Sequence, residues 1–362
     1  MATQEEFNAF YEIHLKPKLV EFEKQRQNIV NKLKTVLFSL IVFSLIVLLL
    51  LVVVAIVMGD SLTEEVLTEI LTEEVLYWGI TAIIVGVVIL VIWTIRFYRR
   101  TISPYKLNFK KEIVGRLVTL VDENLAYDPE KKIPLWEFRT SQLFDRDTID
   151  RWTGEDYVEG TINKIRVKFS EVEAEEYHYD YDDYGYDDNG SGGYYETIFE
   201  GLFFVFNFNL SFQGVTLVLP DVAERYFGGF GKWLQSVGSK ITSKKLVHLD
   251  DPEVEREFVV YSDNPIMARY VLSPRFMRRF LAFRRRLQKQ VFLSFVDGRL
   301  YMAIFVNKDL FEPPVFKTVL NFELISEFFE YMRLGEEIVE DLAIYLNNPR
   351  DMEKNNIPPL IS

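Results

Sequence analysis

Apolar positions are most concentrated in two uninterrupted runs near the start of the chain. Residues 35–58 and residues 76–95 contain no charged residue. As α-helices these runs would be about 36 Å and about 30 Å long, which matches a hydrocarbon core of about 30 Å. Core strands are much shorter, and core helices seldom stay uncharged over such a length. The pattern therefore predicts two transmembrane helices.

The charges around these runs predict their orientation. Lys and Arg are frequent in 16–34 and 96–111, whereas 59–75 contains six acidic residues and no basic one. Cytoplasmic flanks carry the excess of Lys and Arg, so both termini are expected in the cytoplasm and 59–75 is expected to be a short acidic outer loop. The motif LTEEVL occurs twice in this region, at 62–67 and 71–76, and its apolar spacing predicts a short amphipathic helix.

Helical periodicity continues on both sides of the runs. Before the first run, apolar residues recur every three or four positions, which predicts a cytoplasmic amphipathic helix in 1–34, disrupted at Pro17. After the second run the same spacing follows Ser103-Pro104, a typical helix start. Residues 96–126 are therefore expected to form a basic flank and a helical stalk.

From about residue 127 the pattern changes to segments in which apolar residues alternate with polar ones for most of their length, which is typical of strands in a half-buried antiparallel sheet. Predicted strands cover 157–176, 197–213, 215–219, 245–249, 258–261, 291–296 and 300–306. Asp297-Gly298 predicts a tight hairpin between the last two. Predicted helices cover 229–237, 274–290 and 322–346. The fold class is thus α+β: a two-helix transmembrane hairpin followed by a mainly antiparallel-sheet cytoplasmic domain over 127–362.

Composition excludes several kinds of chemistry. The chain has no cysteine, which excludes disulfides, thiolate catalysis, Cys-type zinc sites and iron–sulfur clusters. Its three histidines are far apart in the sequence, which argues against a multi-His metal centre. A formal net charge of −13 argues against nucleic-acid binding, which needs a positive surface. We therefore expect no cofactor and no nucleic-acid partner.

A low-complexity stretch of Tyr, Asp and Gly occupies 177–196. Two registers resemble a calcium-binding loop, one starting at Asp180 and one at Asp187. They place Ser191 and Ile198 where such a loop needs a bidentate Glu, so both fail. The composition predicts a flexible Tyr/Asp-rich loop, and metal binding by it stays an open alternative.

Two further segments resemble known motifs only in part. Gly228 to Lys232 resembles a phosphate-binding loop, but Trp233 stands where that motif has a hydroxyl residue. Acidic residues between Asp250 and Glu257, near His248, are consistent with a metal site. Asp251-Pro252 is more typical of a helix cap followed by a proline in the first turn.

The predicted helix 274–290 carries the strongest local charge. Seven basic residues and no acidic one occur along it, beside an apolar stripe of Phe276, Phe280 and Phe283. The pattern fits a solvated face of a helix packed on the sheet, or a basic patch that faces the membrane or a partner, with about 1 kcal/mol per basic residue near an anionic surface. The residues of this candidate patch are Arg275, Arg278, Arg279, Arg284, Arg285, Arg286 and Lys289. No catalytic, cofactor-binding or metal-binding residue is assigned.

Small residues in the second run point to self-association. Ala82 and Gly86 are four positions apart, so they lie on one face of a helix and allow close approach of a second backbone. A homo-oligomer through this helix is therefore predicted.

Several longer phrases are similar to those of a known family. They include the segment 246–280, FEGLFFVFNFNLSFQGVTLVLPD at 199–221, and SFVDGRLYMAI at 294–304. Together with the two early apolar runs, they resemble a bacterial two-span membrane-protein family known as domain of unknown function 3137. The resemblance implies a location in the inner membrane and a neighbouring protein of the LemA type as a partner. It implies no catalytic residues.

These observations favour a membrane-anchored interaction or scaffolding protein, with the lipid bilayer as one partner. The alternative is a membrane-tethered enzyme whose site is assembled from scattered polar residues such as Asp263, Arg269 and Glu312. A concave pocket with converging polar groups would favour the enzyme, whereas an exposed apolar or strongly charged face would favour the interaction protein.

Overall fold

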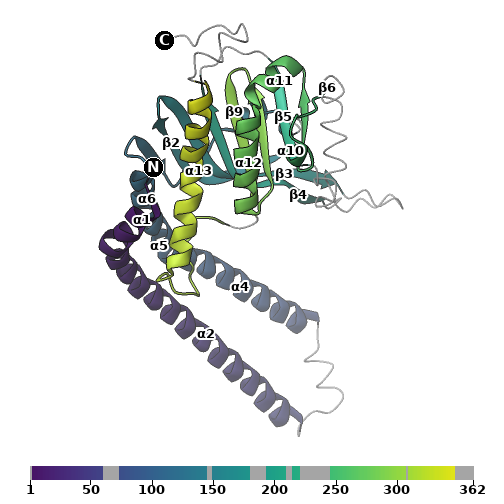
Figure 1. The fold of residues 1–362 in the computed structure, drawn as a ribbon. Helices are drawn as coiled ribbons and strands as arrows, with labels where there is room; N and C mark the ends of the chain where they lie inside the picture. The colour runs from purple at the N-terminus through teal and green to yellow at the C-terminus, as the bar shows by residue number, and fades with distance from the viewer. Residues whose placement is uncertain are drawn as a thin grey trace, which may run out of the picture. The chain divides into compact units, whose positions relative to one another are not determined.

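The computed structural model describes residues 2–59, 73–144, 149–179, 193–208, 214–220, 245–306 and 309–346. Figure 1 shows the path of the chain. The chain divides into two compact units. The sheet unit comprises residues 1–8, 114–311 and 322–362, and the helical unit comprises residues 9–113 and 312–321.

The sheet unit is built on an antiparallel sheet with the strand order β1-β2-β3-β4-β9-β8-β5-β7-β6 among the described residues. Every strand pair in it is antiparallel, which confirms the predicted mainly antiparallel α+β class. The strands are β1 Leu125–Asp128, β2 Arg151–Ile162, β3 Ile165–Tyr179, β4 Gly193–Asn207, β5 Val215–Pro220, β6 Lys245–Leu246, β7 Phe258–Ser262, β8 Val291–Val296 and β9 Arg299–Phe305.

Side chains alternate between the two faces of the sheet, as the two-residue period of a strand requires. On one face, Phe203 and Tyr301 join an apolar core with Phe138 of α7 (Leu135–Thr140). The opposite face is covered by α12 (Pro274–Leu287) and α13 (Phe322–Leu346), which run across the sheet in Figure 1. Both faces are thus buried, which explains why the central strands are apolar along their whole length.

Most predicted elements in the second half of the sheet unit are confirmed. The strands predicted at 215–219, 258–261, 291–296 and 300–306 correspond to β5, β7, β8 and β9. At the predicted hairpin, Asp297 and Gly298 have φ values of 44° and 79°, which suit a type I′ turn. The helix predicted at 322–346 has the bounds of α13. The helix predicted at 274–290 ends at Leu287, because Gln288 adopts a left-handed φ of 53°.

Three strand predictions need correction. The single strand predicted at 157–176 is a hairpin of β2 and β3, and its turn residues Asn163 and Lys164 have φ values of 49° and 70°. This turn contains no Gly, so the alternating pattern seemed to continue through it. The strand predicted at 197–213 is β4, which already begins at Gly193 and ends at Asn207, and the strand predicted at 245–249 is only the two residues of β6.

Other predicted features lie outside the described residues. These are the short helix within the outer loop 59–75, the glycine-rich segment at 228–233 with the helix at 229–237, and residues 180–192 of the Tyr/Asp-rich loop.

The helical unit contains two long helices, α2 (Lys16–Gly59) and α4 (Glu73–Phe97), which cover both predicted membrane spans. Within the part of the chain that the structure describes, no helix meets the length and apolarity needed to cross a membrane. A π-helical segment, η1 (Tyr11–Leu15), links α1 (Gln4–Phe10) to α2.

Pro17 does not interrupt the helical path as predicted, whereas the helix start predicted at Ser103-Pro104 is confirmed. Pro17 lies inside the helical path directly after η1, and Pro104 follows the π-helical segment η2 (Tyr98–Ile102) at the start of α5 (Ser103–Phe109). A proline removes one backbone donor and crowds the preceding turn. A π-helical turn is wider, so it accommodates the ring without a break. The path continues through η3 (Lys110–Val114) and α6 (Gly115–Val121) to a C-cap at Asp122.

Candidate functional site at helix α12

The α12 helix has clear start and stop signals. Ser273 Oγ accepts a hydrogen bond from the backbone N–H of Phe276 at 3.2 Å, and Pro274 occupies the first turn. The helix ends at the left-handed Gln288, whose N–H donates to the carbonyl of Arg284 at 2.9 Å. These caps confine the arginine-rich sequence to one helix of 14 residues.

The apolar stripe of α12 is buried against the sheet. The rings of Phe280 and Phe258 are 5.0 Å apart between centroids, and those of Phe276 and Phe295 are 6.3 Å apart. Phe283 is also buried. Because this stripe faces the sheet, most of the basic residues are directed to the other side of the helix, whereas Arg284 is mostly buried beside Phe258.

Acidic residues from elsewhere in the sheet unit pair with this basic face. Arg278 Nε is 2.6 Å from an Asp251 carboxylate oxygen, and Arg285 Nη1 is 2.6 Å from a Glu253 oxygen. Glu257 accepts from both Arg284 and Arg285. These acids lie at or beside α10 (Pro252–Glu255), about twenty residues before the start of α12 in sequence. The helix contains no acid, so its charge is balanced by tertiary contacts.

The pairing is visible in the pKa of the carboxylates. The hydrogen bond from Arg278 holds the pKa of Asp251 below its usual value. Partial burial of Glu257 alone would raise its pKa, but the hydrogen bonds and charges of Arg285 and Arg284 outweigh this and lower the pKa. Both groups are therefore ionised at neutral pH.

The remaining basic residues have different surroundings. Arg275 is exposed and Lys289 is half-buried, and neither forms an ion pair with any described residue. Arg286 pairs with Glu337 of α13, which also accepts from Arg333 Nη2 at 3.4 Å. The seven residues of the candidate patch therefore do not form one free basic face. At least four of them are paired, Arg284 is mostly buried, and Lys289 lies beyond the end of the helix.

Within the acidic segment 250–257, Asp251 caps the start of α10, as the Asp251-Pro252 pair predicts. Asp251 Oδ1 accepts a hydrogen bond from the N–H of Glu253 at 3.0 Å, and Pro252 begins α10. His248 Nδ1 lies 2.8 Å from Glu255 Oε1. In the described part of the chain, no three His, Asp or Glu side chains are placed to hold a metal ion.

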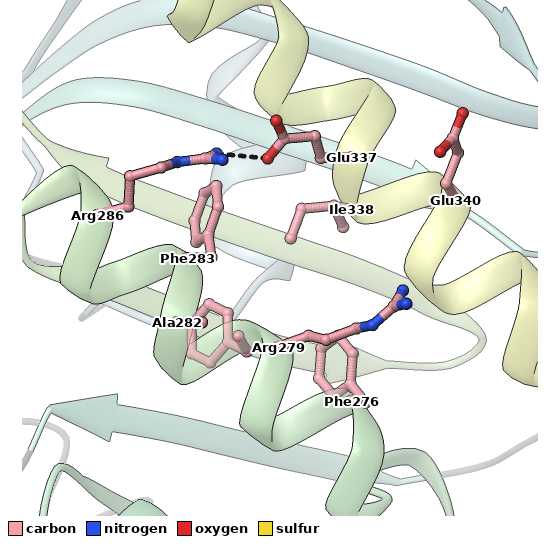
Figure 2. Close-up of a pocket in the computed structure, with 9 residues that line it drawn as sticks. Phe276, Arg279, Ala282, Phe283, Arg286, Glu337, Ile338 and Glu340 are labelled. Atoms are coloured by element: carbon pink, nitrogen blue, oxygen red, sulfur yellow. Dashed lines mark hydrogen bonds and ion pairs between the residues drawn. The ribbon is translucent and has the colours of Figure 1, made fainter. Parts of the chain in front are cut away.

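A groove of about 480 Å³ lies between α12 and α13. Figure 2 shows Phe276, Phe283 and Ile338 along it, with the Arg286–Glu337 ion pair spanning its two helices. Arg279 extends from α12 and Glu340 from α13 on the same side. The groove thus combines an apolar floor with charges of both signs.

Sequence reasoning did not identify α13 as part of this site. Glu337 lies 51 residues beyond Arg286, so no spacing rule links them. One signal was available: Glu330, Arg333 and Glu337 follow a helical spacing on α13 and pair with one another.

The scattered polar residues of the enzyme alternative have separate structural contacts. Asp263 Oδ1 accepts a hydrogen bond from the N–H of Val215 at 2.7 Å, next to β5. Arg269 lies exposed on α11 (Pro265–Val271). Glu312 belongs to the helical unit, where it pairs with Lys106 at 2.7 Å and Lys110 at 2.9 Å.

The comparisons with known proteins first indicate a family. Residues 197–344 match the sequence model of a family described as "Protein of unknown function (DUF3137)". The matched range begins within β4, ends within α13 and includes all of α12. The match supports the family resemblance over this part of the chain.

Among solved structures, the chain is similar to the crystal structure of the mycobacterial trehalose monomycolate transport factor A, TtfA. The identity is 12%, the match covers 69% of this chain and 98% of that one, and the TM-score is 0.33. No curated protein matches the sequence.

Proposed function

We propose that this chain is a membrane-anchored interaction protein. Its helices over 35–58 and 76–95 cross the inner membrane as a hairpin with both termini in the cytoplasm. The sheet unit then binds a protein partner at the groove between α12 and α13.

Exposed apolar side chains along both long helices support the anchor. Phe38 and Leu49 of α2 are 68% and 63% exposed, and Ile89 of α4 is 61% exposed. Transfer of such a side chain out of water contributes about 1.5–3 kcal/mol, and the hydrocarbon of a bilayer provides that environment. The basic flanks and the acidic 59–75 support the orientation.

The groove is the observation that carries the interaction role. Protein–protein interfaces typically have an apolar centre and a polar rim, with Arg and aromatic residues providing much of the binding energy. Here Phe276, Phe283 and Ile338 form the apolar part, and Arg279 and Glu340 form part of the rim. The groove fits a protein segment with one apolar anchor residue flanked by charged residues. A LemA-type protein is the partner that the family resemblance implies.

Site-specific photo-crosslinking in native membranes tests this role. Ala282 lines the groove and is exposed, so a photo-reactive residue placed there should give one discrete crosslinked protein. Ile266, which is 85% exposed on α11, is the matched control position and should give no such species.

Charge reversal then tests whether the charged rim of the groove contributes to binding of the partner. Arg286→Glu places a carboxylate opposite Glu337 and should reduce the crosslinked species, whereas Arg275→Glu changes the same charge at an exposed residue outside the groove and should not. Equal crosslinking from Ala282 and Ile266 would contradict the proposal.

A further inference from the structure

Residues 312–321, here called the strap, join the helical unit through a buried carboxylate. Glu23 of α2 accepts a hydrogen bond from the backbone N–H of Val319 at 3.1 Å. Arg26, one turn later, donates to the carbonyl of Val315 at 3.0 Å. Thr318 Oγ1 also donates to Glu23 at 3.1 Å. The strap is therefore fixed to α2 by two backbone contacts and one side-chain contact.

The other end of the strap is held by α5 and η3. Glu312 pairs with Lys106 and with Lys110, whose side chain is almost fully buried. Pro313 and Pro314 follow directly and restrict the backbone. The strap thus contacts the helices on both sides of the predicted hairpin, before the first run and after the second.

Within this fixed segment Phe316 projects into solvent. It is 82% exposed, although Val319 three residues later is fully buried. Lys317 is exposed beside it, and Leu320 is 42% exposed. An aromatic ring next to a basic residue is typical of segments that lie in the interface of a membrane.

The helices that hold the strap are strongly basic in the segments next to the two predicted spans. Residues 24–34 and 96–111 contain Lys and Arg but no Asp or Glu. Arg26, Lys106 and Lys110 pair with Glu23 or Glu312 of the same unit. The other basic residues are Lys24, Lys32, Lys34, Arg96, Arg99, Arg100 and Lys111. Such a cluster next to a membrane attracts anionic lipid headgroups at about 1 kcal/mol per charge near the surface.

Helix geometry places the strap close to the headgroup layer. Arg26 precedes Thr35 by nine residues in one continuous helix, which corresponds to about 13 Å beyond the edge of the hydrocarbon. The headgroup layer accounts for about 5–8 Å of that distance. The distance that remains between Arg26 and the headgroup layer is about the length of one aromatic side chain. A tilt of the helix shortens this distance further.

We propose that the strap is a membrane-interface anchor: Phe316 inserts among the headgroups of an anionic bilayer, and the basic residues of 24–34 and 96–111 other than Arg26, Lys106 and Lys110 hold the lipid phosphates around it. This inference rests on the proposed membrane hairpin and adds a second, interfacial contact to it.

An environment-sensitive fluorophore on a single cysteine tests the anchor, because the full chain has no native cysteine. A nitrobenzoxadiazole label is attached to Phe316→Cys in full-length protein reconstituted into phosphatidylethanolamine–phosphatidylglycerol vesicles. Its emission should shift to shorter wavelength and be quenched by lipids with a spin label near the headgroup. Vesicles of phosphatidylcholine alone should give a smaller shift.

Ile13→Cys is the matched control. Ile13 is 66% exposed in the same unit, but it precedes Thr35 by 22 residues, about 33 Å along the helical path. Its label should keep the emission of an aqueous environment and remain unquenched. Equal emission at 316 and 13, in protein that floats with the vesicles after alkaline washing, would overturn the anchor and leave the hairpin intact. Failure to float would overturn both proposals.

Discussion

Glu23 has several hydrogen-bond partners in the helical unit. Its carboxylate accepts from the Arg26 guanidinium at 2.6 and 2.9 Å and from Gln27 Nε2 at 2.9 Å, in addition to Val319. The hydrogen bond from Arg26, followed by those from Gln27 and Val319, lowers its pKa to about 2, against the effect of burial. Because the folded pKa is below the unfolded value, the ionised carboxylate stabilises the strap above about pH 4.5. This contribution is lost as the pH falls towards 2.

Replacing Glu23 by Gln should loosen the strap at neutral pH. The neutral amide forms weaker bonds to Arg26 and to the N–H of Val319, and a hydrogen bond to a charged group contributes about 1.5–3 kcal/mol. We expect the amide of Val319 to exchange with deuterium at least about tenfold faster in Glu23→Gln, since 1.4 kcal/mol corresponds to tenfold. Hydrogen-exchange mass spectrometry of the full chain measures this.

Glu21→Gln is the control for that measurement. Glu21 is exposed on the same helix and pairs with Lys18 at 3.3 Å. Exchange at Val319 should be unchanged in this variant. An unchanged rate in Glu23→Gln as well would show that the carboxylate does not hold the strap.

At the scale of elements, turns and helix starts that depend on one short sequence motif are predicted well. Asp297-Gly298, Ser273-Pro274 and Asp251-Pro252 each mark a turn or a helix start that the structure contains. Local chemistry decides these features, because the residues that make the turn or cap are the residues in the motif. The turn at Asn163-Lys164 has no such local motif, because it lacks the glycine that usually marks a turn of this kind, and it is not predicted.

Contacts between distant segments were beyond sequence reasoning. The basic residues of α12 were visible from their sequence, but the neutralising carboxylates come from α10 and α13, brought close by the fold. Strand β1 also went unpredicted because Leu125–Asp128 is short, and it is defined mainly by its pairing with β2. A charge pattern on one helix therefore does not give the net charge of the surface it forms.

Removing Arg284 should destabilise the sheet unit. Its guanidinium is mostly buried, pairs with Glu257 and lies 5.4 Å from the centre of the Phe258 ring. Arg284→Met leaves the half-buried carboxylate of Glu257 with less compensation, which should cost about 1–3 kcal/mol, between the values for surface and buried pairs. Chemical denaturation of the purified full-length protein gives this value.

Two variants complete the Arg284 experiment. Arg275→Met removes an exposed arginine on the same helix and should change the free energy of unfolding by less than about 0.5 kcal/mol. Adding Glu257→Gln to Arg284→Met should recover part of the loss, because the uncompensated charge is then gone. A loss of equal size in both single variants would contradict a specific role for the Arg284–Glu257 pair.

For the whole molecule, the charges separate into two kinds of surface. The overall charge is −13, and α12 shares its positive charges with neighbouring acids. The acid-free segments 24–34 and 96–111 flank the two predicted spans instead. Attraction to an anionic membrane is therefore expected at these two basic segments of the helical unit. The groove of the sheet unit, which carries charges of both signs, suits a protein partner.

Self-association through α4 is a prediction for the assembled protein. A Cβ at Gly86 would meet no atom within 4 Å, so Gly86→Leu causes no clash within the chain. If Gly86 forms the contact between two copies, the larger side chain should weaken crosslinking of the full-length protein in membranes. Val85→Leu, at an exposed neighbouring position, should leave it unchanged. Equal crosslinking in both variants would remove this helix face as the contact.

The membrane hairpin and its orientation underlie the whole account, and single-cysteine labelling in intact cells tests them most directly. The chain lacks cysteine, so each introduced thiol is the only one in the protein. The account predicts that Asp60→Cys and Glu69→Cys react with a membrane-impermeant maleimide in intact cells, whereas Ser362→Cys reacts only after the cells are lysed. Labelling of Ser362→Cys but not of Asp60→Cys in intact cells, or protection of all three, would contradict it.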